Sequence, residues 1–227
     1  MAKAPIVGEA GAGLVPALDV RAAARLHESF VLDVLEKAAA VPDSELVVYY
    51  TPAEALSYFR DAAPYAGACL PQEGENTSER IRYCFEVLSE PGRSVALIRD
   101  DIPTLPAKSL ELAFDVLASG EVDVVFGPTT DRIWYLIGTN APHPELFRDM
   151  DWSASGAIEE SIERAASLGL GWYLLPEWYA VDRPQNLNRL EDDLLRGSSA
   201  GHTEQLLAGR VGFRVASSSR HSGYKMK

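Results

Sequence analysis

The spacing of apolar residues along the chain predicts helices that alternate with strands. Apolar residues recur every three or four positions from Val20 to Ala38, and Asp19 in front of them is a suitable N-cap. The same spacing predicts further helices at 52–60, 78–88, 106–119, 157–168 and 185–195. Short apolar runs predict strands at 46–50, 66–70, 94–98, 122–126, 133–137 and 172–175.

The apolar runs of the predicted strands are continuous rather than alternating, which is typical of strands that are buried on both faces. We therefore expect an α/β fold with a mainly parallel sheet and helices on both faces. A length of 227 residues fits one domain of this kind, which we assign to residues 1–196. The remaining residues, 197–227, are expected to form a C-terminal helix and a partly disordered tail, because residues 214–227 hold four cations, no acid and a serine run.

The charge balance excludes several classes of protein. Lys and Arg number 21 and Asp and Glu number 33, so the net charge is −12, which disfavours a binder of nucleic-acid phosphates. No apolar run approaches the length of a membrane span, and no apolar stretch follows Lys3 as in a secretory signal. Only Cys69 and Cys84 are present, as expected of buried thiols in a reducing compartment. These features predict a cytoplasmic protein without membrane or nucleic-acid partners.

Two adjacent carboxylates stand directly after a predicted buried strand. Asp100 and Asp101 follow the run at 94–98, and sheets of this class bind ligands beyond the carboxyl ends of their strands. Such a pair suits a hard cation, Mg²⁺ or Mn²⁺, that would in turn hold a diphosphate. The alternative is that these acids cap the loop or helix that follows.

Four other polar residues lie at the ends of predicted elements. Asp131 follows the strand at 122–126, and Asp182 lies between the last strand and the last helix. Both carboxylates could face the same crevice, or could serve as a turn aspartate and an N-cap. Glu79 and Arg80 begin a helix, where Arg80 could meet a phosphate or form a surface ion pair.

Other common catalytic patterns are missing from the sequence. The four histidines do not have the spacing of metal ligands, and there is no Gly-x-Ser-x-Gly motif. The segment Gly11-Ala12-Gly13 does not continue into a dinucleotide-binding fingerprint. Hydrolase and nicotinamide-dependent activities are therefore disfavoured.

Six segments, taken in order, resemble one family of small glycosyltransferase-A-like proteins. The segments are Lys3–Gly8, Ser78–Arg80, Arg99–Pro106, Gly127–Gly138, Trp152–Ser153 and Trp178–Leu187. The family belongs to the nucleotide-diphospho-sugar transferase superfamily, includes glycosyltransferases of the arsenosugar-biosynthesis type, and is related to phospholactate guanylyltransferases. The resemblance implies the glycosyltransferase-A-like fold of this superfamily.

The same resemblance implies a donor site. Lys3, Gly8, Glu79 and Arg80 match the segments that would bind the nucleotide of a nucleoside diphosphate sugar. Asp101, with Asp100 and Asp182, would hold Mg²⁺ or Mn²⁺ on the diphosphate. Asp131 would orient or deprotonate a hydroxyl of a small-molecule acceptor, which is the usual task of a placed carboxylate.

The departures from the family pattern affect the expected activity. Gly11-Ala12-Gly13 replaces a Lys-Thr-Arg run, and Glu9 follows Gly8. Arg132-Ile133 replaces a Gly-Gly pair. Arg132 could instead supply a cation for a phosphate from a new direction. Only Met1 and Ala2 precede Lys3, so the first strand is expected to be truncated. The sequence thus favours a metal-dependent glycosyltransferase, and leaves open a nucleotidyltransferase or a catalytically degenerate binding protein.

Overall fold

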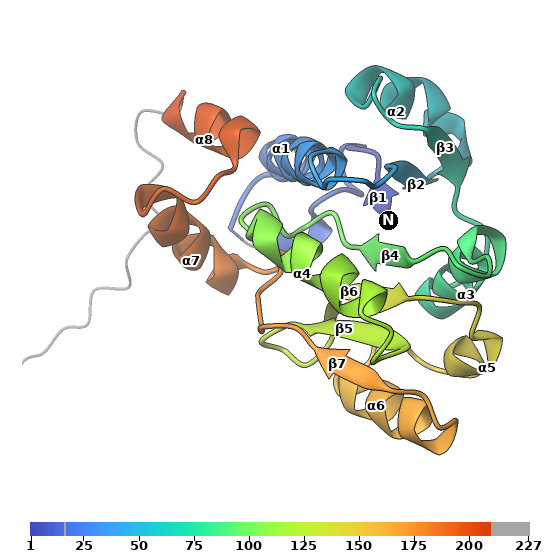
Figure 1. Ribbon diagram of the computed structural model, residues 1–227. Coiled ribbons are helices and arrows are strands. Elements are labelled where there is room, and N and C mark those ends of the chain that lie inside the picture. The colour runs from blue at the N-terminus through green and yellow to red at the C-terminus, as the bar shows by residue number, and fades with distance from the viewer. Residues whose placement is uncertain (16, 210–227) are drawn as a thin grey trace, which may run out of the picture.

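The computed structural model describes residues 1–15 and 17–209 and has the predicted α/β fold (Figure 1). The strands are β1 (Ala2–Lys3), β2 (Val47–Thr51), β3 (Ala68–Pro71), β4 (Val95–Ile98), β5 (Val124–Pro128), β6 (Trp134–Thr139) and β7 (Trp172–Leu174). The helices are α1 (Val20–Ala39), α2 (Leu56–Ala62), α3 (Thr77–Leu88), α4 (Ala107–Ala118), α5 (Pro144–Phe147), α6 (Ala157–Ser167), α7 (Pro184–Leu195) and α8 (Gly201–Ala208). Two short 3₁₀ helices are η1 (Ala12–Leu14) and η2 (Ala53–Ala55).

Each helix and strand predicted from apolar spacing has a counterpart in the structure, which confirms those predictions. Asp19 is the N-cap of α1, because its side chain accepts hydrogen bonds from the backbone N–H groups of Arg21 and Ala22. The elements that apolar spacing did not predict include β1, η1 and α5. These three span four residues or fewer, which is too short for a periodic pattern.

The strands form two hydrogen-bonded sheets. One has the order β1-β2-β3 and is parallel throughout, and the other has the order β4-β6-β5-β7. In the second sheet β7 runs parallel to β5, whereas β6 runs antiparallel to both β4 and β5. The expected mainly parallel sheet is therefore divided in two.

The two sheets meet at β1. The terminal ammonium group of Met1 donates a hydrogen bond to the carbonyl oxygen of Ile98 (2.6 Å), and the N–H of Lys3 donates to Oδ2 of Asp100 (2.6 Å). Because β1 has only two residues, it pairs with Tyr50 and Thr51 and leaves the start of β2 without a partner on that side. The expectation of a short first strand is confirmed.

A cavity of about 700 Å³ lies between β2 and β4. Its walls include Val47 and Tyr49 of β2, and Val95 and Leu97 of β4, and Met1 lies at one end. The two strand edges therefore face each other without hydrogen-bonding to each other, which is the unpaired arrangement that sheet edges normally avoid.

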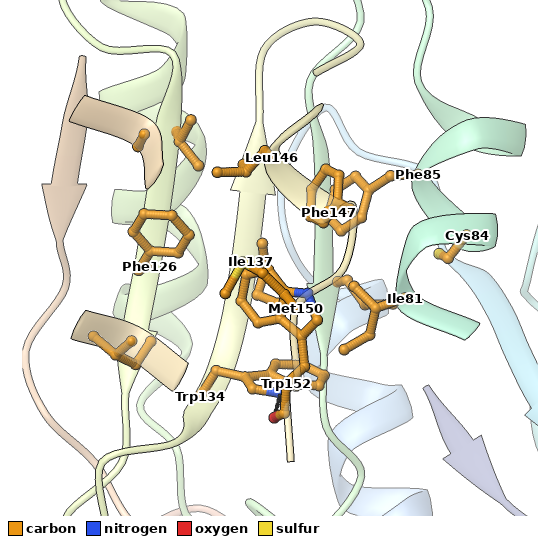
Figure 2. Packing of buried hydrophobic residues seen from close by; sticks show 14 of the residues in the cluster. Ile81, Cys84, Phe85, Phe126, Trp134, Ile137, Leu146, Phe147, Met150 and Trp152 are labelled. Carbon is orange, nitrogen blue, oxygen red and sulfur yellow. Dashed lines mark hydrogen bonds between the residues drawn. The ribbon is translucent and has the colours of Figure 1, made fainter. Parts of the chain in front are cut away.

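Helices cover both faces of the second sheet, as the alternation along β5 shows. Val124 and Phe126 pack in a cluster with residues of α3, α5 and α6, whereas Val125 packs in a cluster with residues of α1 and α4. Figure 2 shows the first cluster, in which the rings of Phe85 and Phe147 stack with centroids 4.3 Å apart. The sheet is thus buried between two apolar layers at β5.

The edge strand β7 differs from the expectation of a strand buried on both faces. Trp172, Tyr173 and Leu174 are 37–40% exposed. The reason is that β7 has only β5 as a neighbour, so its other edge faces solvent. A continuous apolar run does not distinguish this partly exposed position from a central strand.

The helix expected after residue 196 is α8, which is attached to α1. Asp33 is 3% exposed, and its carboxylate accepts hydrogen bonds from the backbone N–H groups of His202 and Thr203 and from the Thr203 hydroxyl. Residues 210–227, which include the basic tail and its predicted disorder, lie outside the described residues. Within the described part, no helix has the length and apolar character needed to cross a membrane.

Candidate functional site

A cavity of about 410 Å³ lies at the carboxyl ends of β1 to β4. Lys3 ends β1, Thr51 ends β2, Gln72 follows β3, and the segment 99–101 follows β4. Met1 donates to the carbonyl oxygen of Ile98, and Lys3, two residues on, donates to the side chain of Asp100, so β1 lies beside β4 and runs in the same direction. The cavity therefore occupies the place where ligands bind in α/β sheets.

The remaining walls come from later parts of the chain. Helix α3 contributes Thr77 and Arg80 from its first turn, and the start of β6 contributes Trp134. Arg183 stands at the N-cap of α7. The other lining residues from these parts are Ile133, Trp152, Ser153 and Asp182.

Charged side chains dominate the lining of this cavity. Four are cations, namely Lys3, Arg80, Arg99 and Arg183, and three are acids, namely Asp100, Asp101 and Asp182. The protein as a whole has a net charge of −12, so the cavity gathers cations against the general trend of the molecule. The larger cavity beside β2 and β4 has three charged side chains in its walls, Asp43, Glu45 and Arg93, and lacks this grouping of cations.

Arg99 forms the centre of the charged group. Its Nε donates to Oδ1 of Asp101 (2.9 Å) and its Nη2 donates to Oδ2 of the same carboxylate (2.5 Å). The same Nη2 lies 3.5 Å from Oδ2 of Asp182. Burial opposes the charge of Arg99 and is the largest single influence on it, but Asp101, Asp182 and Asp100 together outweigh burial and raise the pKa of Arg99, which therefore stays charged.

Asp182 is the least satisfied carboxylate in the cavity. Its Oδ1 is buried without a hydrogen-bond partner among the described residues, at 3.7 Å from Nε of Arg183. Burial raises the pKa of Asp182, the negative charge of Asp101 raises it further, and Arg99 acts in the opposite direction. Burial and Asp101 thus disfavour the charged form of Asp182.

Asp100 has partners within the protein. Its Oδ2 accepts the hydrogen bond from the N–H of Lys3, and the same atom forms an ion pair with Nε2 of His27 at 3.4 Å. Burial alone would raise the pKa of Asp100, but His27 and the Lys3 N–H lower it. Burial would lower the pKa of His27, but Asp100 raises it. Each partner therefore favours the charged form of the other.

The loop after β1 forms contacts within itself, so that the Lys3 ammonium is engaged by Glu9. The ammonium of Lys3 donates to the carbonyl oxygen of Glu9 (3.1 Å) and lies 3.9 Å from its carboxylate. A Cβ on Gly11 would lie 2.7 Å from the carbonyl oxygen of Ala23, and one on Gly13 would lie 2.0 Å from that of Asp182. The two glycines are thus required for close packing of backbone on backbone.

The start of α3 separates the two residues that the sequence paired as nucleotide ligands. Glu79 belongs to the cap of the helix, because its N–H donates to Oδ1 of Asn76 (2.9 Å) and its Oε2 accepts from the N–H of Glu75 (2.8 Å). Arg80 lines the cavity, and its Nε donates to the carbonyl oxygen of Gly74 (2.9 Å). Only Arg80 of this pair reaches the candidate site.

Asp131 lies beside the cavity and contacts it through Arg183. One oxygen of Asp131 accepts from the Thr129 hydroxyl (2.6 Å) and the other from Nη2 of Arg183 (2.7 Å). Arg132 has a φ of 65° and pairs with Glu159, so the idea that it supplies a phosphate cation here is wrong for this arrangement. It is 64% exposed and does not line the cavity.

The structure thus brings together five of the residues selected from the sequence: Lys3, Arg80, Asp100, Asp101 and Asp182. Gly8 is exposed, would have no atom within 4 Å of an added Cβ, and does not line the cavity. Sequence reasoning missed Arg99 and Arg183 as site residues. Each adjoins a selected aspartate, so attention to the neighbours of Asp100 and Asp182 could have found them.

The acids of the cavity do not fit a divalent cation in this arrangement. Both oxygens of Asp101 accept hydrogen bonds from Arg99, and Asp100 binds Lys3 and His27. In the described part of the chain, no group of three or more His, Cys, Asp or Glu residues could hold a metal ion. One unpartnered oxygen of Asp182 is far from the several oxygen ligands that Mg²⁺ requires.

Comparison with solved structures supports the superfamily. The chain is similar to a protein from Desulfovibrio desulfuricans G20 described as a "putative nucleotide-diphospho-sugar transferase", with 25% identity, a TM-score of 0.77 and coverage of 91% of each chain. It shares its fold with a 4-diphosphocytidyl-2C-methyl-D-erythritol synthase at 14% identity and a TM-score of 0.54, over 74% of this chain and 88% of that one. A cytidylyltransferase from Leptospira borgpetersenii gives 12% identity and a TM-score of 0.51, over 79% and 82%.

Comparison of sequences gives the family. No curated protein sequence matches the chain. A family profile described as "Uncharacterized protein conserved in bacteria (DUF2064)" matches residues 34–154, which include α3, β4, α4, β5 and β6. The fold agrees with the superfamily named in the sequence analysis, and nothing in these matches addresses the arsenosugar subtype. Because the profile covers more than half of the 227 residues, this chain belongs to the DUF2064 family and has the fold of a nucleotide-diphospho-sugar transferase.

Proposed function

We propose that this protein is a transferase whose donor is a nucleoside diphosphate sugar and whose acceptor is a small molecule. The observation that carries the proposal is the set of four cations around one cavity at the carboxyl ends of the strands. A diphosphate is the part of such a donor that needs several cations at once. The similarity to a protein described as a nucleotide-diphospho-sugar transferase supports this choice of donor.

The arginines are suited to different parts of a diphosphate. Arg80 approaches from the first turn of α3, where backbone N–H groups and the helix dipole also favour an anion. Arg183 approaches from the opposite wall, at the N-cap of α7. Each charge-assisted hydrogen bond to a phosphate oxygen contributes about 1.5–3 kcal/mol. Two or three such bonds account for micromolar binding of a nucleotide, which corresponds to about 8 kcal/mol with the base and ribose included.

Asp131 has a positioning role in this proposal. Its carboxylate holds Nη2 of Arg183 at 2.7 Å and so directs that guanidinium toward the cavity. The role of general base toward the acceptor, which the family resemblance implies, requires Asp131 to exchange this ion pair for a contact with a hydroxyl. A substitution of Asp131 with Asn would lower donor affinity in the first role and turnover alone in the second.

The test is calorimetric binding of a panel of nucleoside diphosphate sugars and nucleoside triphosphates to the full chain, in EDTA and in Mn²⁺. We expect one of them to bind, and Arg80→Gln to weaken it about 10- to 100-fold, as the loss of one charge-assisted bond predicts. The matched control is Arg82→Gln, because Arg82 is on the same helix but pairs with Glu86 on the surface. Binding of nucleoside triphosphates alone would point to nucleotidyl transfer, and no binding in either condition would refute the proposal and favour a degenerate relative.

A further inference from the structure

The acids expected to hold a metal are already bound to an internal cation. The planar guanidinium of Arg99 forms a two-point contact with Asp101 and lies 3.5 Å from Asp182. This is the fork geometry in which arginine matches a carboxylate. The side chain of Arg99 is 17% exposed and that of Asp101 is 13% exposed, so little water competes with the pair.

We propose that Arg99 takes the position of the divalent cation, so that the protein binds the diphosphate of its donor without a metal. The inference rests on the proposed function for its ligand. A metal ion between Asp101 and Asp182 would meet the guanidinium of Arg99 at short range, and the two positive charges would repel each other. Arg99 therefore both neutralises the two carboxylates and excludes a second cation from them.

Arg99 also has donors left for an anion. Its Nε and Nη2 bind carboxylate oxygens, whereas its Nη1 has no hydrogen-bond partner among the described residues. A guanidinium has five N–H donors, so the Nη1 pair remains for phosphate oxygens. Arg99 lines the cavity together with Arg80 and Arg183, so a diphosphate there would contact three guanidinium groups.

The surrounding acids fix the place of Arg99 by their geometry. Both oxygens of Asp101 accept hydrogen bonds from Arg99, and Oδ2 of Asp182 lies 3.5 Å from the same Nη2. Oδ2 of Asp100 is engaged by Lys3 and His27 instead. Two of the three acids of the cavity thus face Arg99.

The first arm of the test measures Mn²⁺ binding to the nucleotide-free protein by electron paramagnetic resonance. We expect the wild-type protein to leave Mn²⁺ free and Arg99→Ala to bind it, because the substitution uncovers Asp101 and Asp182. Arg99→Gln, which also removes the charge, replaces the alanine variant if that one is poorly folded, and it should likewise bind Mn²⁺. Arg99→Lys, which retains a charge, is the matched control and should leave Mn²⁺ free. Wild-type protein that binds Mn²⁺ as tightly as Arg99→Ala would overturn the inference.

The second arm compares nucleoside diphosphate binding in EDTA and in Mn²⁺. We expect the affinity of the wild-type protein to agree within about twofold in both, and Arg99→Gln to bind about 10- to 100-fold more weakly. Binding that disappears in EDTA would refute metal-independent binding while leaving the proposed function intact. If no nucleotide binds in either condition, the proposed function fails, and the Mn²⁺ arm still decides whether Arg99 excludes the metal.

Discussion

Substitution of Asp100 should reveal whether this residue supports the fold or serves a ligand. Its side chain is 17% exposed, and its carboxylate accepts the N–H of Lys3 at 2.6 Å and pairs with His27 at 3.4 Å. Asp100→Ala would remove both contacts at once and leave a charged histidine, 8% exposed, without its counter-charge. If Asp100 were instead a metal ligand, its removal would stabilise the metal-free protein, because it would relieve repulsion between neighbouring acids.

The magnitude follows from the burial of the pair. Removal of one partner of a buried ion pair costs about 3–5 kcal/mol, out of a total stability of about 5–15 kcal/mol. With a urea dependence of about 2 kcal/mol per molar, the midpoint of unfolding should fall by roughly 1.5–2.5 M. Asp100→Asn keeps an acceptor for Lys3 and should lose roughly half as much.

The assay is urea unfolding at neutral pH, followed by tryptophan fluorescence and repeated by circular dichroism. Asp61→Ala is the surface control and should stay within about 0.5 kcal/mol of the wild-type protein. Asp182→Ala should cost far less than Asp100→Ala, because burial and Asp101 already disfavour the charge of Asp182. An Asp100→Ala protein as stable as the Asp61→Ala control would refute the reasoning and return Asp100 to the group of candidate ligands.

Three further results are expected. The contribution of His27 should depend on pH: its pKa is raised above 6.5, so the stability it adds is present below pH 6.5 and is lost as the pH rises through the raised value. The difference in unfolding free energy between wild-type protein and His27→Gln should therefore be larger at pH 6 than at pH 9, and an equal difference at both would count against a charged pair. An extension of four β-branched residues ahead of Met1 should enter the cavity between β2 and β4 and replace the buried ammonium with an amide N–H. It should add about 1–3 kcal/mol relative to a Gly-Ser extension of equal length, and equal melting temperatures would contradict this. Gly13→Ala should cost about 1–3 kcal/mol, because its Cβ would lie 2.0 Å from the carbonyl oxygen of Asp182. Gly201→Ala, where the space is open, is the control, and equal stabilities would show that the loop shifts freely.

The secondary structure and the fold class could be predicted from the sequence, because both depend on local patterns. Apolar spacing identified α1, α2, α3, α4, α6 and α7, and continuous apolar runs identified β2 to β7. The strand end at Ile98 directed attention to the cavity, since ligands of parallel sheets bind there. Such a pattern could not identify β1 and α5, which are too short to be periodic.

The roles of the charged residues emerge only in the folded chain. Asp100 and Asp101 are neighbours in sequence, yet one turns toward Lys3 and His27 and the other toward Arg99. Glu79 and Arg80 are separated in the same way, one in a helix cap and the other in the cavity wall. The physical reason is that adjacent side chains point in different directions, so their partners come from distant segments that meet only after folding. The order of residues along the chain thus determines at which strand ends the cations and acids gather, and the three-dimensional fold selects which of them neutralise one another.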